Sequence, residues 1–292
     1  MKTLKHYCWL VAVAVAVFSC TEKTAATTIS DEPDPVPVPP QEDTIVDVKI
    51  VPHDTTFARW INTIKLSVVE PSSLCWSKAG NTFFVAGDNG AINEVRPSSG
   101  ANKAIVFNQT GYDWEGLALD SEADVLYALA ERGNKIYSLS GTGHKTCELF
   151  LDATIPGTQD GSDNYGCEGL EYHDGILYLG NQHNPCLIQR VNAETKEVID
   201  NTTITFCKFI SDLCYDDYDD SMWILESNAT KEGGDGIAKI YNCTLPDCTL
   251  RCTLTLPYTD QAEGMEIDRK NGLIYICCDK TGNLYTLEYG FN

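Results

Sequence analysis

Acidic residues recur along this chain with a spacing that would suit a metal site. Three short apolar segments begin with Glu-Gly and a fourth with Ser-Asp: Glu115-Gly116-Leu117, Glu168-Gly169-Leu170, Glu263-Gly264-Met265 and Ser211-Asp212-Leu213. Further carboxylates follow apolar runs of the same units, with Gln182 in one place: Asp88, Glu131, Glu226 and Asp279. Oxygen donors without an organised His or Cys set favour Ca²⁺, which takes about 6 to 8 oxygen ligands, over zinc or copper.

The segments that must position these carboxylates form an internal repeat. Each unit continues after a polar gap with a second strand-like run and then a third, as in residues 116–119, 125–129 and 135–139. A degenerate copy begins at residue 73, and equivalent residues 73, 115, 168, 212 and 263 lie 42 to 53 positions apart. Helical periodicity is nearly absent, so the repeat predicts an all-β fold, a β-propeller.

The number of units predicts five blades. A sixth blade is the alternative if a divergent unit lies within residues 140–166 or 44–69. The last unit has three strands, at residues 264–267, 273–277 and 283–288, and leaves a place for one more at the rim. We expect an N-terminal strand near residues 62–69 to fill this place and close the ring, because closure removes open sheet edges.

Propeller geometry would bring the carboxylates together. The first strand of a blade runs beside the central axis and the second is antiparallel to it, so the start of the first and the end of the second share one mouth of the channel. At ~6 Å and an effective dielectric near 20, each like-charge pair costs roughly 2 to 3 kcal/mol. We therefore expect a calcium ion there, with Glu115, Glu168, Asp212 and Glu263 from the first strands as ligands. Carboxylates at the ends of the second strands belong to the same expected metal site: Glu131, Asp88, Glu226 and Asp279. The alternative is that these acids cap turns or pair with Arg132, Lys135 and Lys280, and that the adjoining glycines serve only close packing of blades.

The N-terminal region predicts export and lipidation. Lys2 and Lys5 precede an apolar run at residues 9–18, which is too short for a bilayer-spanning helix of about 20 residues. Residues 17–20 look like a bacterial lipobox, with Cys20 as the lipid-modified residue; ordinary signal-peptidase cleavage is the alternative. We predict a lipoprotein signal peptide at residues 1–19, a disordered Pro-, Thr- and acid-rich tether at 20–43 and a single propeller domain at 44–292.

Charge and cysteine content narrow the choice of partners. Loss of the two lysines of residues 1–19 would change the formal net charge from −21 to −23, which disfavours nucleic acid and anionic membrane surfaces as partners.

Of 13 cysteines, Cys8 lies in the expected leader and Cys20 is the expected lipidation site, which leaves 11. Cys243, Cys248 and Cys252 lie close together around an expected turn, so a disulfide among them is open, with its connectivity undetermined.

Other catalytic signatures are weak. The chain contains neither a GxSxG elbow nor an HExxH motif. Of the histidines, only His183 falls at the acidic mouth, where a role as general base would need a positioned substrate proton. Tyr112 and Trp114 precede Glu115 and are the aromatic residues that we expect to contact a ligand, together with Arg132, Gln182 and His183.

Several of these segments together resemble the SdiA-regulated protein family, the YjiK-type propellers of bacterial envelopes. The resemblance covers residues 72–289 and is carried by Tyr112-Asp113-Trp114-Glu115-Gly116-Leu117 with Ala130-Glu131-Arg132, Cys167-Glu168-Gly169-Leu170 with Gln182-His183-Asn184-Pro185, Ile210-Ser211-Asp212-Leu213, and Gln261-Ala262-Glu263-Gly264-Met265. It implies a propeller with a calcium site at the axis and a distant kinship with lactonase, phosphotriesterase and esterase-like phytase propellers. This chain departs from the family pattern at Gln182, where Glu is usual, and at Asp212, where Gly is commoner.

Two functions are consistent with these features. The first is a monomeric, calcium-dependent module, lipid-anchored in the cell envelope at the outer membrane, that binds a small molecule or an envelope protein. The second is a metal-dependent hydrolase of lactones or phosphoesters, in which the ion polarises the substrate and activates water. An ion with an open coordination position beside a general base would favour the hydrolase.

Overall fold

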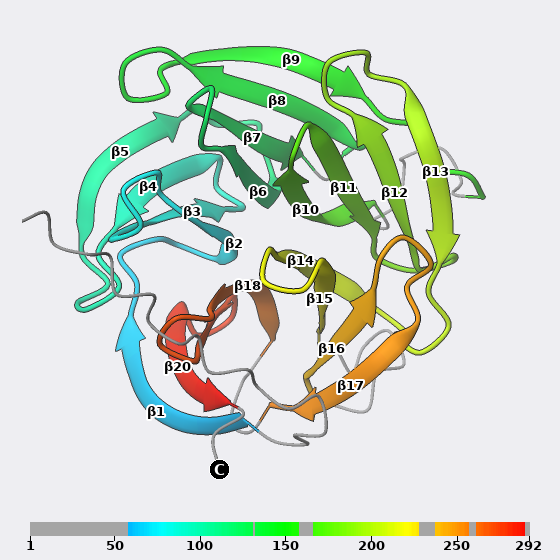
Figure 1. Ribbon diagram of the computed structural model, residues 1–292. Coiled ribbons are helices and arrows are strands. Elements are labelled where there is room, and N and C mark those ends of the chain that lie inside the picture. Colours follow the sequence, from blue (N-terminus) through cyan, green and yellow to red (C-terminus); the bar gives the residue numbers. More distant parts are fainter. Residues whose placement is uncertain (1–57, 131, 158–165, 228–236, 257–260, 290–292) are drawn as a thin grey trace, which may run out of the picture. The chain divides into compact units, whose positions relative to one another are not determined.

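The computed structural model describes residues 58–289, apart from residues 131, 158–165, 228–236 and 257–260. The described residues form five four-stranded antiparallel sheets arranged around one axis, and they contain no helix (Figure 1). The predicted five-bladed propeller is thus confirmed. All of the described residues belong to one compact unit of the chain. The predicted signal peptide, the tether and Cys20 lie outside the described residues.

The first four sheets each follow the chain from the axis outward. Their strands are β2 (Pro71–Trp76), β3 (Phe83–Gly87), β4 (Ala91–Val95) and β5 (Asn102–Asn108); β6 (Trp114–Asp120), β7 (Val125–Ala130), β8 (Lys135–Ser140) and β9 (Thr146–Asp152); β10 (Cys167–His173), β11 (Ile176–Asn181), β12 (Leu187–Asn192) and β13 (Val198–Thr203); β14 (Ile210–Asp216), β15 (Ser221–Glu226), β16 (Lys239–Thr244) and β17 (Leu250–Thr255). We refer to these sheets as blades 1 to 4.

Blade 5 joins the two ends of the described chain. It consists of β18 (Ala262–Asp268), β19 (Leu273–Cys278), β20 (Asn283–Tyr289) and, at the rim, β1 (Ala58–Lys65). The register runs from Ala58 opposite Tyr289 to Lys65 opposite Asn283. An N-terminal strand therefore closes the ring as predicted, although it begins before the expected residue 62.

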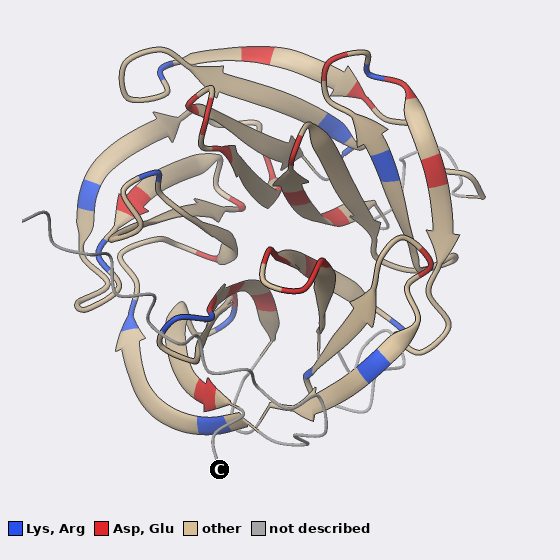
Figure 2. Cartoon of the chain, viewed as in Figure 1, with Lys and Arg blue, Asp and Glu red and all other residues tan. Residues whose placement is uncertain are grey.

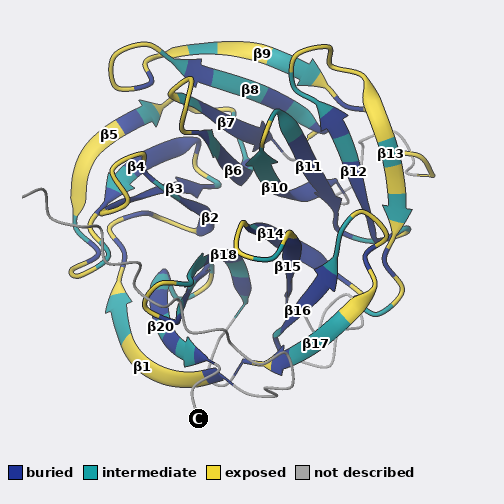
Figure 3. Cartoon of the chain, in the orientation of Figure 1, coloured by how far each residue is buried: buried dark blue, intermediate teal, exposed yellow. Residues whose placement is uncertain are grey.

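Apolar residues between neighbouring blades make up the core. Five buried clusters each draw on two adjacent blades; Phe84 of blade 1, for example, shares a cluster with Leu117 of blade 2. Figure 3 shows this pattern as buried inner strands and largely exposed rim strands. The rim strand β1 is mostly exposed, because no further strand lies outside it.

Every inner strand carries an irregularity near its start. The register shifts between Pro71 and Ser73, Trp114 and Gly116, Cys167 and Gly169, Ile210 and Asp212, and Ala262 and Gly264. A β-bulge leaves one residue unpaired and turns its side chain relative to the ladder. The five bulged residues are therefore equivalent: Ser72, Glu115, Glu168, Ser211 and Glu263.

Candidate functional site

The bulges place three of the four predicted inner-strand carboxylates at equivalent positions. Glu115, Glu168 and Glu263 are the bulged residues of blades 2, 3 and 5. The residues just beyond the second strands lie at the same mouth, because Asp88 N donates to Glu70 O over 3.2 Å and Asp279 N donates to Gln261 O over 3.2 Å. Gln182 N makes the matching bond to Gly166 O over 3.0 Å. Glu131 lies outside the described residues.

Asp212 does not share the position of the three glutamates. It is equivalent to Gly116, Gly169 and Gly264, and Ser211 takes the glutamate position in blade 4. Its buried carboxylate accepts hydrogen bonds from Leu213 N over 2.9 Å and from Met265 N over 2.8 Å in the next blade. Because neighbouring residues of a strand face opposite ways, a one-residue offset turns Asp212 toward blade 5.

Glu226 is offset in the same way at the end of the second strand. It pairs with Ile210, which makes it equivalent to Gly87 and Asn181, and Ser227 occupies the position of Asp88 and Gln182. Its buried carboxylate accepts hydrogen bonds from Lys208 N over 2.7 Å and Tyr241 Oη over 3.1 Å. Blade 4 therefore contributes two serines, and no carboxylate, at the two positions that are acidic elsewhere.

A compact group of carboxylates lies between blades 1 and 2. One ligand oxygen of each of Asp88, Asp113 and Glu115 lies within 4.8 Å of the others, and all three residues are partly buried. We call Asp88, Asp113 and Glu115 the acidic triad. Asp113 was missed from the sequence, although its alternation with buried Trp114 puts it on the same side of the extended chain as Glu115.

Burial and neighbouring acids favour the protonated form of Asp88. Burial raises the pKa of Asp88 to about 6, a hydrogen bond from the Ser72 hydroxyl opposes the rise, and the charges of Asp279 and Asp113 add to it. Burial also raises the pKa of Asp279, with a further contribution from Glu70. The Oδ1 atom of Asp279 is buried and has no hydrogen-bond partner among the described residues. This mouth therefore concentrates negative charge that a cation would neutralise.

The triad fits the dimensions of a calcium site. Ca²⁺–oxygen distances of about 2.3–2.6 Å place ligands on opposite sides of the ion roughly 5 Å apart, and nearer ligands closer. Oxygens within 4.8 Å of one another satisfy this limit. Three carboxylates supply three to six oxygens depending on bidentate binding, and water can complete a shell of about 6 to 8. In Figure 2, acidic segments lie on inner strands and hairpin turns near the ring centre.

Glu168 and Gln182 form a separate pair in blade 3. The Gln182 side-chain amide donates to Glu168 Oε1, and both residues are buried. The Nδ1 atom of His183 lies 3.1 Å from Gln182 Oε1, and its ring lies 5.4 Å from that of Phe209. The Gln182 amide thus satisfies the Glu168 carboxylate without a cation at this point.

The expected ligand-contacting residues divide into buried and accessible ones. Trp114 is completely buried and stacks on Tyr112 with centroids 4.5 Å apart, in the core between blades 1 and 2. It therefore presents no surface to a ligand, because the inner strand directs it into the blade interface. Tyr112 is partly exposed and Arg132 is exposed in the turn after β7.

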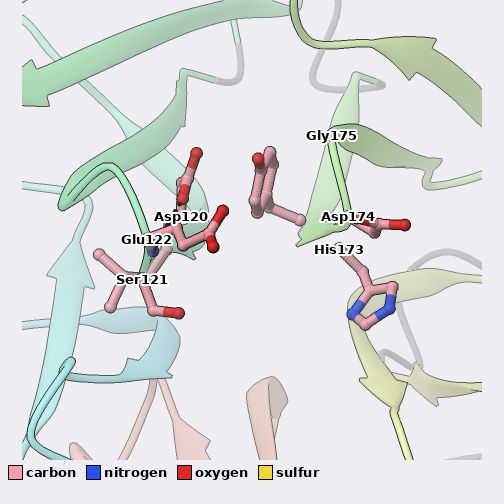
Figure 4. Close-up of a pocket in the computed structure, with 8 residues that line it drawn as sticks. Asp120, Ser121, Glu122, His173, Asp174 and Gly175 are labelled. Carbon is pink, nitrogen blue, oxygen red and sulfur yellow. Dashed lines mark hydrogen bonds between the residues drawn. The ribbon is translucent and has the colours of Figure 1, made fainter.

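A pocket of about 560 Å³ opens at the other end of the inner strands. The turns that follow β6 and β10 line it, with Asp120 and Glu122 on one side and His173 and Asp174 on the other (Figure 4). Asp120 accepts hydrogen bonds from the backbone N–H groups of Glu122 and Ala123, over 3.0 and 2.9 Å. These bonds identify Asp120 as the residue that fixes the β6–β7 turn.

Comparisons with known proteins support the architecture. No protein-family model and no curated protein sequence matches the chain. The crystal structure of glutaminyl cyclase from Myxococcus xanthus is similar, with a TM-score of 0.60 and 12% identity, covering 80% of this chain and 96% of that one. Two further structures are less similar. Kuenenia stuttgartiensis hydrazine synthase has a TM-score of 0.47 and 10% identity, covering 73% of this chain and 56% of that one. A nidogen/laminin complex has a TM-score of 0.49 and 11% identity, covering 74% of each chain. At 12% identity the likeness to the glutaminyl cyclase is one of fold alone.

Among the described residues, none lies in a helix that could cross a membrane.

Proposed function

We propose that this protein is a calcium-binding propeller of the cell envelope that uses one mouth of its ring to bind a partner. The observation that carries the proposal is the acidic triad, whose oxygens lie within 4.8 Å of one another. At such a separation and an effective dielectric near 20, each ionised pair repels by about 3 kcal/mol. Calcium binding would replace this repulsion by attraction and join blade 1, through Asp88, to blade 2, through Glu115.

The bound ion would also organise the surface around it. Asp113 lies in the segment that enters β6, next to the partly exposed ring of Tyr112. Holding Asp113 and Glu115 on one ion would fix this segment at the mouth, where Tyr112 supplies aromatic surface. We propose that the partner is a small molecule or an envelope protein that contacts this segment, and that Arg132 meets an anionic group of it.

The family assignment and cellular location belong to the same proposal. The Glu-Gly segments and their order support membership of the SdiA-regulated family, and the lipobox-like residues 17–20 support anchoring at the outer membrane through Cys20. Replacing Cys20→Ser should move the protein from the membrane fraction to the soluble fraction and abolish labelling by a radioactive fatty acid. Unchanged labelling would contradict the lipid anchor.

Calcium titration of the purified protein tests the central claim. Isothermal titration calorimetry should detect Ca²⁺ binding, and a chelator should lower the melting temperature. Asp88→Asn and Glu115→Gln should each weaken binding at least tenfold, because each removes one charged ligand. Glu148→Gln, an exposed acid on rim strand β9, is the matched control and should bind as the wild type does. No bound calcium and no effect of chelator would refute the proposal.

Hydrolysis of lactones or phosphoesters is the alternative that the same preparations decide. A panel of both substrate classes, assayed with calcium and with chelator, would reveal calcium-dependent turnover that Glu115→Gln abolishes. Calcium binding without turnover supports a binding module. The similarity to glutaminyl cyclase does not add cyclase activity to these candidate functions, because at 12% identity it indicates a shared fold alone.

A further inference from the structure

Four cysteines meet in two pairs within one buried cluster. The described residues include 11 cysteines, and the structure draws no disulfide between them. Cys186, Cys207, Cys243 and Cys248 belong to the apolar cluster between blades 3 and 4, and each is at most 8% exposed. Cys186 and Cys207 are side-chain hydrogen-bond partners, and so are Cys243 and Cys248.

The backbone holds the first pair in place from both sides. Ile204 N donates to Cys186 O over 2.9 Å, which extends the pairing of β12 with β13 by one residue. The Cys186 thiol also lies 2.9 Å from Lys208 O, the carbonyl immediately after Cys207. Cys207 is therefore fixed opposite Cys186 by contacts on either side of it in the sequence.

A tight turn brings the second pair together. Thr244 N donates to Thr249 O over 3.0 Å, so the chain from Cys243 to Cys248 folds back on itself at the end of β16. Cys252, the third cysteine of this region, pairs with Asn242 and packs on the cluster between blades 4 and 5. It lies on the opposite face of the sheet from Cys243, so the structure selects Cys248 as the partner.

The remaining described cysteines are distributed over the other blade interfaces. Cys75 and Cys147 pack between blades 1 and 2, Cys167 between blades 2 and 3, and Cys214 between blades 4 and 5. Cys277 and Cys278 are adjacent in β19 and face different clusters, as neighbours in a strand must.

We infer that the mature protein carries two disulfides, Cys186–Cys207 and Cys243–Cys248. Each bond forms with loss of two protons and two electrons from a pair of thiols. A dithiol–disulfide oxidant, such as an envelope thiol oxidoreductase in its disulfide form, accepts them: one thiolate attacks the oxidant, and the second displaces it from the mixed disulfide as a dithiol. The inference rests on the paired thiols and is independent of the calcium site.

Oxidation would leave the Gln182 carbonyl with a hydrogen-bond donor. The Cys186 thiol lies 2.9 Å from Gln182 O and would lose its hydrogen on oxidation. That carbonyl still accepts from Ile210 N over 2.9 Å. The Cys186–Cys207 bond would then tie the start of β12 to the segment that leads into blade 4, and would hold the Gln182 loop at the mouth of the channel.

Peptide mapping of the full chain tests both bonds. The protein is exported to an oxidising compartment, alkylated under denaturing conditions and digested without reductant. Mass spectrometry should find the Cys186 and Cys207 peptides joined, and the Cys243 and Cys248 sites protected from alkylation. Each disulfide-containing species should have a mass two hydrogens lower than that of the same peptides in reduced form. A parallel sample of reduced protein treated with oxidised glutathione should give the same two bonds.

Alkylation of all four cysteines in both samples would overturn the inference, as would a Cys243–Cys252 bond. As a second measurement, reductant should lower the wild-type melting temperature by roughly 5–10 °C. The Cys186→Ala/Cys207→Ala variant should lose most of this response, and the control Cys252→Ser should keep it. A reductant effect unchanged in the double variant would also count against the first bond.

Discussion

Glu266 of the last blade accepts a hydrogen bond from the backbone N–H of Trp76 in the first blade, over 2.9 Å. Its other oxygen accepts from Ile267 N over 3.2 Å. Glu171 makes the same bridge between Tyr172 N and Tyr215 N, over 2.6 and 2.9 Å. Together with Asp212, these carboxylates cap inner-edge N–H groups that have no neighbouring strand, and they tie adjacent blades together beside the axis.

These bridges predict a pH-dependent stability. Burial raises the pKa of Glu266 from 4.5 to about 8, with a contribution from the Glu171 charge, and burial raises the pKa of Glu171 to about 7. Because the folded state holds the proton more tightly, the stabilisation is complete below about pH 4.5 and is lost as the pH rises through 7 to 8. Glu266→Gln should therefore gain stability relative to the wild type as the pH increases from 5 to 9.

Thermal melting across this pH range checks the expectation. The difference between the melting temperatures of Glu266→Gln and the wild type should increase from pH 5 to about pH 8 and then level off. Glu148→Gln at the rim is the control, and its melting temperature should change with pH as that of the wild type does. A difference that stays constant, or that falls with rising pH, contradicts the role of Glu266.

Calcium affinity should depend on the protonation of Asp88. Because the pKa of Asp88 is raised to about 6, protons compete with the ion at and below that pH. We expect the affinity to be nearly constant above pH 7 and to fall about tenfold per pH unit below about 5.5, for the one proton displaced. Titration calorimetry at several pH values measures this, and Asp88→Asn should flatten the dependence. Affinity that does not change between pH 7.5 and pH 5 would show that Asp88 is not a ligand.

Gly116→Ala should destabilise the ring at the axis. A Cβ atom at Gly116 would come within 2.7 Å of Leu170 Cβ and 2.8 Å of Glu168 O in the next blade. Overpacking of this kind costs about 1–3 kcal/mol, and the upper end is expected because the second contact is with backbone. Urea unfolding measures the change.

The equivalent residue in blade 1 provides the comparison. Ser73 already has a Cβ at this position, and its hydroxyl accepts a hydrogen bond from Leu117 N over 3.0 Å. Ser73→Ala should cost only about 0.5–1.5 kcal/mol, the value of one neutral hydrogen bond. Equal losses for the two variants would mean that the glycine is not required by close packing.

Removal of the closing strand should expose an open sheet edge. Without β1, the edge of β20 from Asn283 to Tyr289 would lose its pairing partner. Unpaired edges favour aggregation, so a variant that lacks residues 58–65 should melt at a lower temperature and form oligomers in size-exclusion chromatography. Arg59→Ala, which removes only an exposed ion pair with Glu288, should remain monomeric and nearly as stable. A fully stable monomer without β1 would contradict closure by this strand.

The repeat in the sequence was sufficient to predict the number of blades and the closing strand. The repeat led to a wrong assignment in blade 4, where Asp212 and Glu226 lie one residue away from the positions that hold acids in the other blades. When Leu213 is aligned with Leu117, Asp212 falls at the position of Gly116 and Ser211 at that of Glu115, so the offset is visible in the sequence, but the acidic character of Asp212 favoured its assignment as a ligand. The bulge in β14 decides which of the two side chains turns toward the mouth.

The order of apolar runs, turns and Glu-Gly pairs by itself determined an all-β propeller with acids near one mouth, because strand alternation and repeat length are local properties of the chain. The tertiary structure alone decided that Asp113 joins Asp88 and Glu115, and that Glu171, Asp212 and Glu266 bridge blades. It also decided which cysteines face each other. Those relationships join residues of different strands and turns, and their distances follow from ring closure and blade packing, which no local pattern records.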